Sequence, residues 1–339
     1  MSKEKMKLGR IALNNHLILA PMQNVSSAPY RRFCRKVSDN VGLVIVPMLY
    51  TKRLEKNPSS VELELYRIKE ERPIGVQLIG SSMDSLKKSI IFLESYEFDF
   101  LDLNAGCPSK RAIKAKEGGY LMSDLETLRQ LIQTALKYSS RPVSLKIRTG
   151  YEKTVEIDKF INMIDNLGLE FITIHGRTVK DRFKDTKIDL DTIKKIKKNI
   201  SIPVIGNGDL VDHNSAKHFL EHTNVDGLMI GRGSIGNPEI FTQIDKFLND
   251  GTEISIKNDI NKWQHLIKLY EDCIDDFLDE NSPIKYEKEI FKFGELYRNS
   301  IWLTKNIKES TSIRRNISKA KNLIQLKGIF ERIIQSFNS

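Results

Sequence analysis

The stretch LDLNAGCPSK, residues 101–110, brings a thiol to the end of a predicted strand. Leucine and alanine alternate with Asp102 and Asn104, and the alternation stops at the Gly-Cys-Pro of residues 106–108. Alternation of period two is typical of a strand, and glycine followed by proline ends one. A thiol there can act as a general acid, because thiols titrate near about 8.5 and are mostly protonated at neutral pH. The alternative is that Cys107 is a small buried hydrophobic residue, as free cysteines usually are.

Further predicted strands also carry polar side chains on a single face. In 142–150 and 169–178, apolar residues alternate with polar ones, and 73–80 has one glutamine in an otherwise apolar run. Burying such groups without partners costs several kcal/mol each, so we expect them to face a site that binds an anion or an electron-rich ring. The alternative is that the polar groups only pair with one another. The polar residues are Gln77, Ser144, Lys146, Arg148, Thr173, His175 and Arg177.

Glycines follow two more strands, in GNGD (206–209) and GRG (231–233). The predicted phosphate-binding glycines are Gly206, Gly208, Gly231 and Gly233, and Arg232 adds charged donors. Glycine lets backbone N–H groups approach an anion, and loops after the last two strands of a barrel often bind phosphate. Turns use glycine as well, so either pair alone is a weak signal.

A unit that repeats eight times positions these residues. Apolar strand-like runs alternate with amphipathic stretches that suit helices, which predicts parallel βαβ units. Eight units predict a closed (β/α)8 TIM barrel of the α/β class over residues 1–250. An open doubly wound sheet is the alternative, but no GxGxxG follows the first strand. The predicted strands are 16–22, 41–48, 73–80, 98–106, 142–150, 169–178, 202–209 and 225–233. Among the predicted helices are 84–96, 124–138, 188–198 and 214–221.

After the barrel, residues 255–339 are predicted to form a second, all-α domain, with helices over 256–280, 284–302 and 312–336. Residues 285–339 contain 12 Lys or Arg and 5 Asp or Glu, so +7 of the net charge of +10 lies in them. This excess predicts a basic face for a polyanion such as RNA, whereas the alternative is an ordinary solvated helical surface. The aromatic residues of 285–311 are expected to form the core of the helical bundle.

The composition narrows the class of protein. The chain of 339 residues is 40% hydrophobic, which is enough for a large core. Its three cysteines are too few and too scattered for a disulfide framework or a zinc site, and Cys34 and Cys273 are expected to be packing residues. No stretch approaches the length of a membrane span. We therefore expect a soluble cytoplasmic monomer that holds no structural metal.

Taken together, the motifs resemble the dihydrouridine synthases, flavin-dependent enzymes that reduce uridines in transfer RNA. The resemblance covers roughly residues 11–245 and implies a TIM barrel that binds FMN, with NADPH as the reductant. In this family a helical carboxyl-terminal domain cradles tRNA, and the tail of this chain is similar to that domain. The matching motifs, in order, are APM, GVQLIGS, DLNAGCPSK, KEGG, LKIRTG, IHGRT, IGNGD and IGRGSIGNP.

The resemblance also implies a role for each matching residue. Cys107 would be the catalytic proton donor, and Lys146 would face the polar edge of the flavin ring with His175 nearby. The uracil would meet Asn104, Arg148 and Arg177. The remaining FMN contacts would come from Pro21, Met22, Gln23, Gln77, Asn207, Gly208, Asp209, Gly231 and Arg232.

Two segments differ from the family pattern, namely APMQNVSSAPYRR after the first strand and VPMLYTKRL after the second. Both lie near the predicted flavin and substrate entrance, so the RNA target stays open, with ribosomal RNA as an alternative to tRNA. Two rival functions compete with RNA reduction. One is a flavin reductase of small molecules, of the dihydroorotate or enoate type, which the basic tail disfavours. The second is an RNA-binding factor that has lost catalysis, which the intact Cys107, Lys146 and His175 disfavour.

Overall fold

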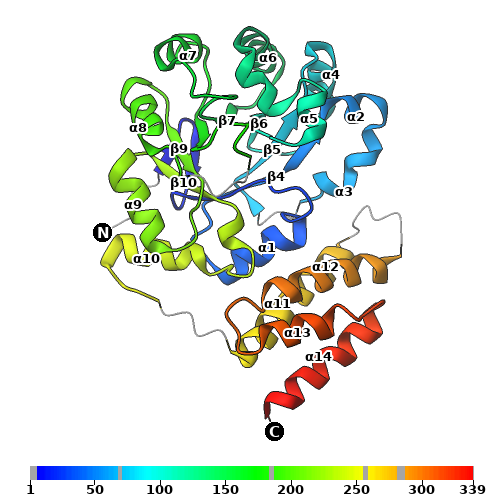
Figure 1. The fold of residues 1–339 in the computed structure, drawn as a ribbon. Coiled ribbons are helices and arrows are strands. Elements are labelled where there is room, and N and C mark those ends of the chain that lie inside the picture. Colours follow the sequence, from blue (N-terminus) through cyan, green and yellow to red (C-terminus); the bar gives the residue numbers. More distant parts are fainter. Residues whose placement is uncertain (1–5, 68–70, 183–186, 255–258, 281–286, 339) are drawn as a thin grey trace.

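The strands of the computed structural model close into a barrel. Strands β3 to β10 pair in parallel in the order β10-β3-β4-β5-β6-β7-β8-β9 (Figure 1), which confirms the predicted (β/α)8 barrel. The model describes residues 6–67, 71–182, 187–254, 259–280 and 287–338. The strands are β3 (Leu17–Leu19), β4 (Leu43–Tyr50), β5 (Ile74–Ile79), β6 (Phe100–Ala105), β7 (Val143–Arg148), β8 (Ile172–His175), β9 (Val204–Asn207) and β10 (Gly227–Ile230).

Helices cover the outside of the barrel. Several begin at a polar cap that the sequence supplies: the side chains of Ser82, Asp124, Asp189 and Asp212 each accept a backbone N–H in the first turn of their helix. The predicted helices 84–96, 124–138, 188–198 and 214–221 correspond to α4, α6, α8 and α9. The barrel helices are α1 (Ala28–Val37), α2 (Thr51–Lys56), α3 (Glu62–Leu65), α4 (Met83–Leu93), α5 (Lys110–Lys114), α6 (Leu125–Tyr138), α7 (Ile157–Ile164), α8 (Leu190–Asn199), α9 (His213–Thr223) and α10 (Ile240–Asp250).

The two faces of each strand separate as the alternation predicts. In β7, Val143, Leu145 and Ile147 belong to the large hydrophobic core between the barrel and its helices. Ser144 and Lys146, on the opposite face, form hydrogen bonds inside the barrel, Ser144 to Asp102 of the adjacent β6 and Lys146 to Asn207 of β9, two strands away. The predicted inward polar face is therefore confirmed.

A short antiparallel hairpin was not predicted. Strands β1 (Met6–Leu8) and β2 (Ile11–Leu13) precede the barrel, and their leucine and isoleucine side chains pack in a second core with Phe100 and Phe171. Because Phe100 opens β6 and Phe171 directly precedes β8, the hairpin covers the amino-terminal end of the barrel. The barrel is thus closed at that end, and only the carboxyl ends of the strands can admit a ligand.

Four further helices follow the barrel, and they lie together beside α1 (Figure 1). They are α11 (Ile260–Asp279), α12 (Lys288–Trp302), α13 (Ser310–Ile317) and α14 (Leu323–Asn338). The prediction of one helix over 312–336 is wrong, because two helices meet at a turn there. The predicted residues 256–258 and 284–286 lie outside the described part of the chain. Within the described residues, no helix combines the length and the apolar character needed to cross a membrane.

The helical domain, which is our name for α11–α14, shares a hydrophobic core with the barrel. The ring of Tyr270 lies 6.5 Å from that of Tyr30 and 5.0 Å from that of Phe33, measured between centroids. Around this contact, Arg32 forms an ion pair with Asp276 at 3.1 Å. Deleting the helical domain would expose fully buried aromatic rings on α1, so a truncated barrel is a poor test of what the tail binds.

Candidate functional site

All the predicted site residues lie at the carboxyl ends of the barrel strands. They come from seven of the eight strands or from the loops that directly follow them, so the topology gathers them at one barrel mouth. The residues are Pro21, Met22 and Gln23 after β3; Gln77 in β5; Asn104 in β6 and Cys107 after it; Lys146 and Arg148 in β7; His175 in β8 and Arg177 after it; Asn207 in β9 with Gly208 and Asp209 after it; and Gly231 and Arg232 after β10.

A buried carboxylate organises the interior below the mouth. Asp102 accepts hydrogen bonds from Gln77 Nε2 at 2.6 Å and from Ser144 Oγ at 2.7 Å. Burial raises the pKa of Asp102 to about 6, while these two hydrogen bonds and the charge of Lys146 act in the opposite direction. Some of the inward polar groups therefore do pair with one another, and this pairing fixes Gln77 beneath the mouth.

Asn104 shapes the turn that carries Cys107. Its Oδ1 accepts the backbone N–H of Gly106 at 3.1 Å and that of Cys107 at 2.9 Å. Its Nδ2 donates to Gln77 Oε1 at 2.8 Å. Asn104 thus links the Asp102 network to the turn, and at least part of its function is to position Cys107.

The thiol of Cys107 is partly exposed, unlike the buried thiols of Cys34 and Cys273. Its Sγ lies 3.4 Å from the hydroxyl of Ser109, which also caps α5. Burial and the proximity of Cys107 raise the pKa of Tyr50, and the Arg111 guanidinium lies 3.9 Å from the centre of its ring. Cys107 therefore opens toward the mouth among polar groups, whereas Cys34 and Cys273 are packing residues as predicted.

The KEGG motif supports this turn from behind. Gly119 N–H donates to the carbonyl of Cys107 at 3.0 Å. A Cβ at Gly118 would lie 2.9 Å from Ile79 Cδ1 and 3.0 Å from Cys107 Cβ, and its φ of +58° favours glycine. Both glycines thus allow close packing against the cysteine, a role that the sequence did not reveal.

Lys146, Asn207 and His175 line the opposite wall of the mouth. Lys146 Nζ donates to Asn207 Oδ1 at 3.0 Å, and Asn207 Nδ2 donates to the carbonyl of Met229 at 2.6 Å. Burial, followed by repulsion from Arg148, lowers the pKa of Lys146 to about 8. Burial and the nearby cations also lower the pKa of His175 strongly, so its ring is neutral at pH 7.

The arginines of the mouth are engaged by the protein itself. Arg148 donates to the carbonyls of Gly106, Thr178 and Arg182, at 2.8–3.1 Å. Arg177 lies beyond the end of β8, and with Arg232 it pairs with the carboxylate of Asp209. The Arg177 hydrogen bond holds the pKa of Asp209 below its usual range. Arg232 stays more than half exposed, so it is the arginine of this pair that is open to a ligand.

The four predicted phosphate-binding glycines divide into two groups. A Cβ at Gly206 would lie 2.2 Å from the ring of Phe219, and one at Gly233 would lie 2.1 Å from the carbonyl of Leu210, so packing explains both. At Gly231, by contrast, a Cβ would meet nothing closer than 3.6 Å. Gly208 has φ of +128°, which side chains rarely adopt. A Cβ at Gly208 would also lie 2.7 Å from Ile188 Cδ1, so packing distinguishes only Gly231 from the other three, and the phosphate contacts of all four stay predictions.

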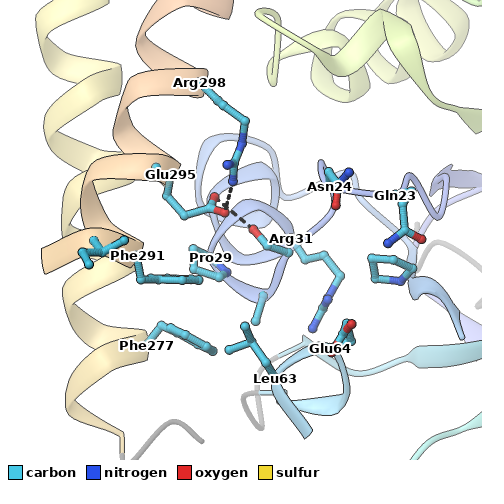
Figure 2. A pocket seen from close by; sticks show the side chains of 15 residues that line it. Gln23, Asn24, Pro29, Arg31, Leu63, Glu64, Phe277, Phe291, Glu295 and Arg298 are labelled. Carbon is cyan, nitrogen blue, oxygen red and sulfur yellow. Dashed lines mark hydrogen bonds and ion pairs between the residues drawn. The ribbon is translucent and has the colours of Figure 1, made fainter. Parts of the chain in front are cut away.

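A groove of about 450 Å³ opens between the barrel mouth and the helical domain. Figure 2 shows Gln23 and Asn24 at one end, with Glu295 and Arg298 of α12 reaching in from the opposite side. Its apolar wall includes Pro29, Leu63, Phe277 and Phe291. Of the predicted site residues, the lining of the groove includes Gln23, so the groove adjoins the site through the loop after β3.

Sequence reasoning missed the contribution of the helical domain to this region. Ser27 at the end of the first loop donates to Glu295, which lies 268 residues away in the chain. No pattern of period two or 3.6 reports a contact at that separation. Ser109, by contrast, could have been found, because a serine after Cys-Pro and before a helix-compatible stretch is a typical N-cap.

Comparison with known proteins gives matches over most of the chain. The family model "Dihydrouridine synthase (Dus)" matches residues 18–337, which includes the helical domain. A tRNA-dihydrouridine synthase B of Pasteurella multocida is 32% identical over 274 residues, covering 78% of this chain and 81% of that protein. A probable tRNA-dihydrouridine synthase of Rickettsia conorii is 29% identical, covering 79% of this chain and 81% of that protein.

A solved structure is similar in fold alone. The 6-hydroxypseudooxynicotine amine oxidase of Pseudomonas geniculata N1 superposes with a TM-score of 0.54 at 14% sequence identity. The match covers 73% of this chain, and it spans about half (49%) of the length of that oxidase chain. This similarity supports the architecture of the barrel and carries nothing about its chemistry.

Proposed function

The chain belongs to the dihydrouridine synthase family, a family of oxidoreductases, and from this premise we propose that it reduces the C5–C6 bond of specific uridines in tRNA. FMN is the proposed cofactor and NADPH the proposed reductant. The Pasteurella and Rickettsia relatives carry tRNA in their names, which supports tRNA as the substrate class.

One observation carries this proposal furthest. Cys107 is the only partly exposed cysteine of the chain, and it stands at the mouth on a turn that Asn104 fixes through two hydrogen bonds. Saturation of a uracil requires a proton at C5 and a hydride at C6. A thiol held at this place can supply the proton.

The residues of the mouth fit a flavin nucleotide. The imidazole Nδ1 of His175 and the hydroxyl of Thr173 are buried without a partner among the described residues, as expected where a polar ring edge is to bind. Lys146 on β7 and Gln77 on β5 add polar groups, which the structure holds in place through Asn207 and Asp102. The backbone N–H groups after β10 are the proposed contacts of the phosphate, because a Cβ at Gly231 would meet nothing closer than 3.6 Å and the adjacent Arg232 is exposed.

Each residue then has a task. Reduced FMN, when bound, supplies the hydride for C6 of the uracil. Cys107 holds the proton at Sγ and delivers it to C5, so that the thiolate is left and must regain a proton from solvent, which the Ser109 hydroxyl 3.4 Å away can relay. Lys146 and His175 orient the ring edge, and Arg148 keeps Gly106 and the Cys107 turn in place through its hydrogen bond.

RNA binding is assigned to the helical domain and to the groove that leads to it. Part of the basic charge of the tail is neutralised locally, since Lys292 pairs with Glu271 and Asp275 of α11. Exposed cations that can contact phosphates include Lys308 in the turn before α13, Arg315 on α13 and further cations on α13 and α14. Contacts between basic side chains and phosphates contribute affinity for RNA but no sequence specificity.

The proposal is tested on the full-length protein with Cys107→Ala. NADPH-dependent reduction of the flavin should persist, while RNA-dependent reoxidation without oxygen should slow by about 10²–10⁴-fold. Cys34→Ala and Cys273→Ala, both in the shared core, should leave the reoxidation rate near the wild-type value when FMN content is equal. Stopped-flow absorbance measures all three, and a normal rate for Cys107→Ala would refute the general acid.

The RNA target is tested separately. Dihydrouridine is mapped in total RNA from cells with and without the gene. Loss of dihydrouridine from tRNA positions is expected, whereas a loss confined to ribosomal RNA would reassign the substrate. A protein that binds no FMN after reconstitution would refute the flavin assignment.

A further inference from the structure

The loop Pro21–Ser27, here called the mouth loop, is held from two sides. It follows β3 and contains Met22 and Gln23, which the family resemblance places against FMN. Internal hydrogen bonds fold it tightly: Met22 N–H donates to Ser26 Oγ at 2.9 Å, and the Met22 carbonyl accepts the N–H groups of Val25 and Ser26 at 3.1 Å. The contacts that hold this loop against the barrel therefore also position one wall of the proposed FMN site.

The barrel itself holds the loop through a buried ion pair. Arg31 and Glu71 are both fully buried and lie 2.8 Å apart. Arg31 Nη1 also donates to the carbonyl of Ser26 at 3.0 Å, and Arg31 Nη2 donates to the carbonyl of Tyr66 at 3.0 Å. This anchor belongs to the barrel and does not involve the helical domain.

The second anchor comes from the helical domain. Glu295 of α12 is 5% exposed, and its Oε2 accepts a hydrogen bond from Ser27 Oγ at 3.1 Å. The same oxygen accepts from the hydroxyl of Tyr270, and Oε1 pairs with Arg298. A buried carboxylate with three donors is well satisfied, so its position is fixed (Figure 2).

Ser27 is at a position where its hydroxyl would normally serve the helix. It is the N-cap residue of α1, yet it makes no side-chain capping hydrogen bond there. Serine at an N-cap usually accepts a backbone N–H of the first turn. Here the hydroxyl accepts no such N–H and donates to Glu295, so its hydrogen bond is with the helical domain.

We propose that Glu295 is a positioning residue, which ties the mouth loop to α12 through Ser27 and so holds Met22 and Gln23 in place for FMN. The inference rests on the proposed function, because it assumes that FMN binds at the mouth. It adds that the helical domain contributes to the cofactor site as well as to RNA binding. Gln23 and Ser27 of the mouth loop and Glu295 of α12 all line the groove between them.

The test uses Ser27→Ala and Glu295→Gln in the full-length protein. Ser27→Ala removes only the hydrogen bond to the loop and leaves Tyr270 and Arg298 on the carboxylate. We expect the Kd for FMN to rise about threefold to tenfold in Ser27→Ala and at least as much in Glu295→Gln. Hydrogen exchange of the mouth-loop amides should accelerate in both variants. Fluorescence titration gives the Kd, and mass spectrometry of peptides gives the exchange.

The matched control is Lys292→Met on the same helix, where the ion pairs join α12 to α11 without touching the mouth loop. It should change neither FMN affinity nor exchange of the loop. Unchanged FMN affinity in Ser27→Ala and Glu295→Gln would overturn the inference alone, even if thermal stability fell. Absence of FMN binding by the wild-type protein would overturn the proposed function, and this inference with it.

Discussion

Replacing Asn104 tests whether this residue positions Cys107 or contacts the substrate directly. In the structure, its carbonyl oxygen accepts the N–H groups of Gly106 and Cys107, and its amide donates to Gln77. Asn104→Ala removes all of these contacts. Asn104→Asp keeps an acceptor for both backbone N–H groups and loses the amide donor. Comparing the two variants therefore distinguishes the acceptor that holds the turn from the amide N–H donor.

The expected loss of stability follows from the backbone N–H groups of Gly106 and Cys107, which lose their acceptor. Each buried N–H that loses its acceptor costs about 1–2 kcal/mol, so Asn104→Ala destabilises the native turn by about 2–4 kcal/mol. If the turn relaxes to a different conformation, the population of the reactive geometry falls by about 30- to 700-fold, because every 1.4 kcal/mol is a factor of about ten. Asn104→Asp should retain reoxidation within about tenfold of wild type.

Anaerobic stopped-flow with RNA measures these reoxidation rates, and flavin absorbance confirms equal FMN content. Alkylation by iodoacetamide provides a second reading, since Cys107 is the only partly exposed thiol and its reaction rate should change in Asn104→Ala. A rate for Asn104→Asp as low as that of Asn104→Ala, with intact fold and cofactor, would refute the positioning role. The amide donor would then be the essential group.

The same geometry supports three more predictions. Burial lowers the pKa of Lys146 to about 8, so above that pH the unfolded state binds more protons than the native state. The free energy of unfolding should therefore rise by about 1–2 kcal/mol between pH 7.5 and 9.5. Urea titrations measure this rise, which should be absent in Lys146→Met. Arg232→Ala should weaken FMN binding by about 10- to 100-fold in a fluorescence titration, since it removes a charge-assisted donor, and unchanged affinity would place the phosphate elsewhere. RNA affinity should fall steeply as the salt concentration rises. The double variant Lys308→Ala/Arg315→Ala should reduce the slope of log Kd against log salt by about 1–2. An unchanged slope would exclude α13 and the turn before it from the RNA interface.

The barrel could be predicted because its signal is local and repeated. Each strand is a short apolar run, and each following helix carries an amphipathic pattern, so eight weak predictions support one another. Alternation alone predicts Ser144 and Lys146 on the inner face, and their hydrogen bonds to Asp102 and Asn207 confirm it. The β1–β2 hairpin was missed because three-residue strands are too short for a period to show.

Partners across the barrel could not be predicted in the same way. Extending the alternation of β8 predicts Arg177 on the inner face, but that strand ends at His175 and the arginine instead reaches Asp209. Gly206 is a predicted phosphate-binding glycine, and the structure adds that the ring of Phe219 occupies the place that its Cβ would need. In both cases the determining contact lies on another element, and sequence spacing contains no information about it.

Two arginines of the mouth are buried and hydrogen-bonded to the protein, whereas several cations of the helical domain are exposed to solvent. Arg148 and Arg177 are buried and already hydrogen-bonded to fixed acceptors, so they form a rigid polar wall that does not have to be reorganised when a ring binds. Lys308 and Arg315 are exposed on the helical domain, where salt ions compete with them for phosphates. Added salt should therefore weaken phosphate contacts of the helical domain, whereas the hydrogen bonds that Arg148 and Arg177 make to the protein should persist. Glu295, which connects α12 to the mouth loop, lies between these two sets of cations.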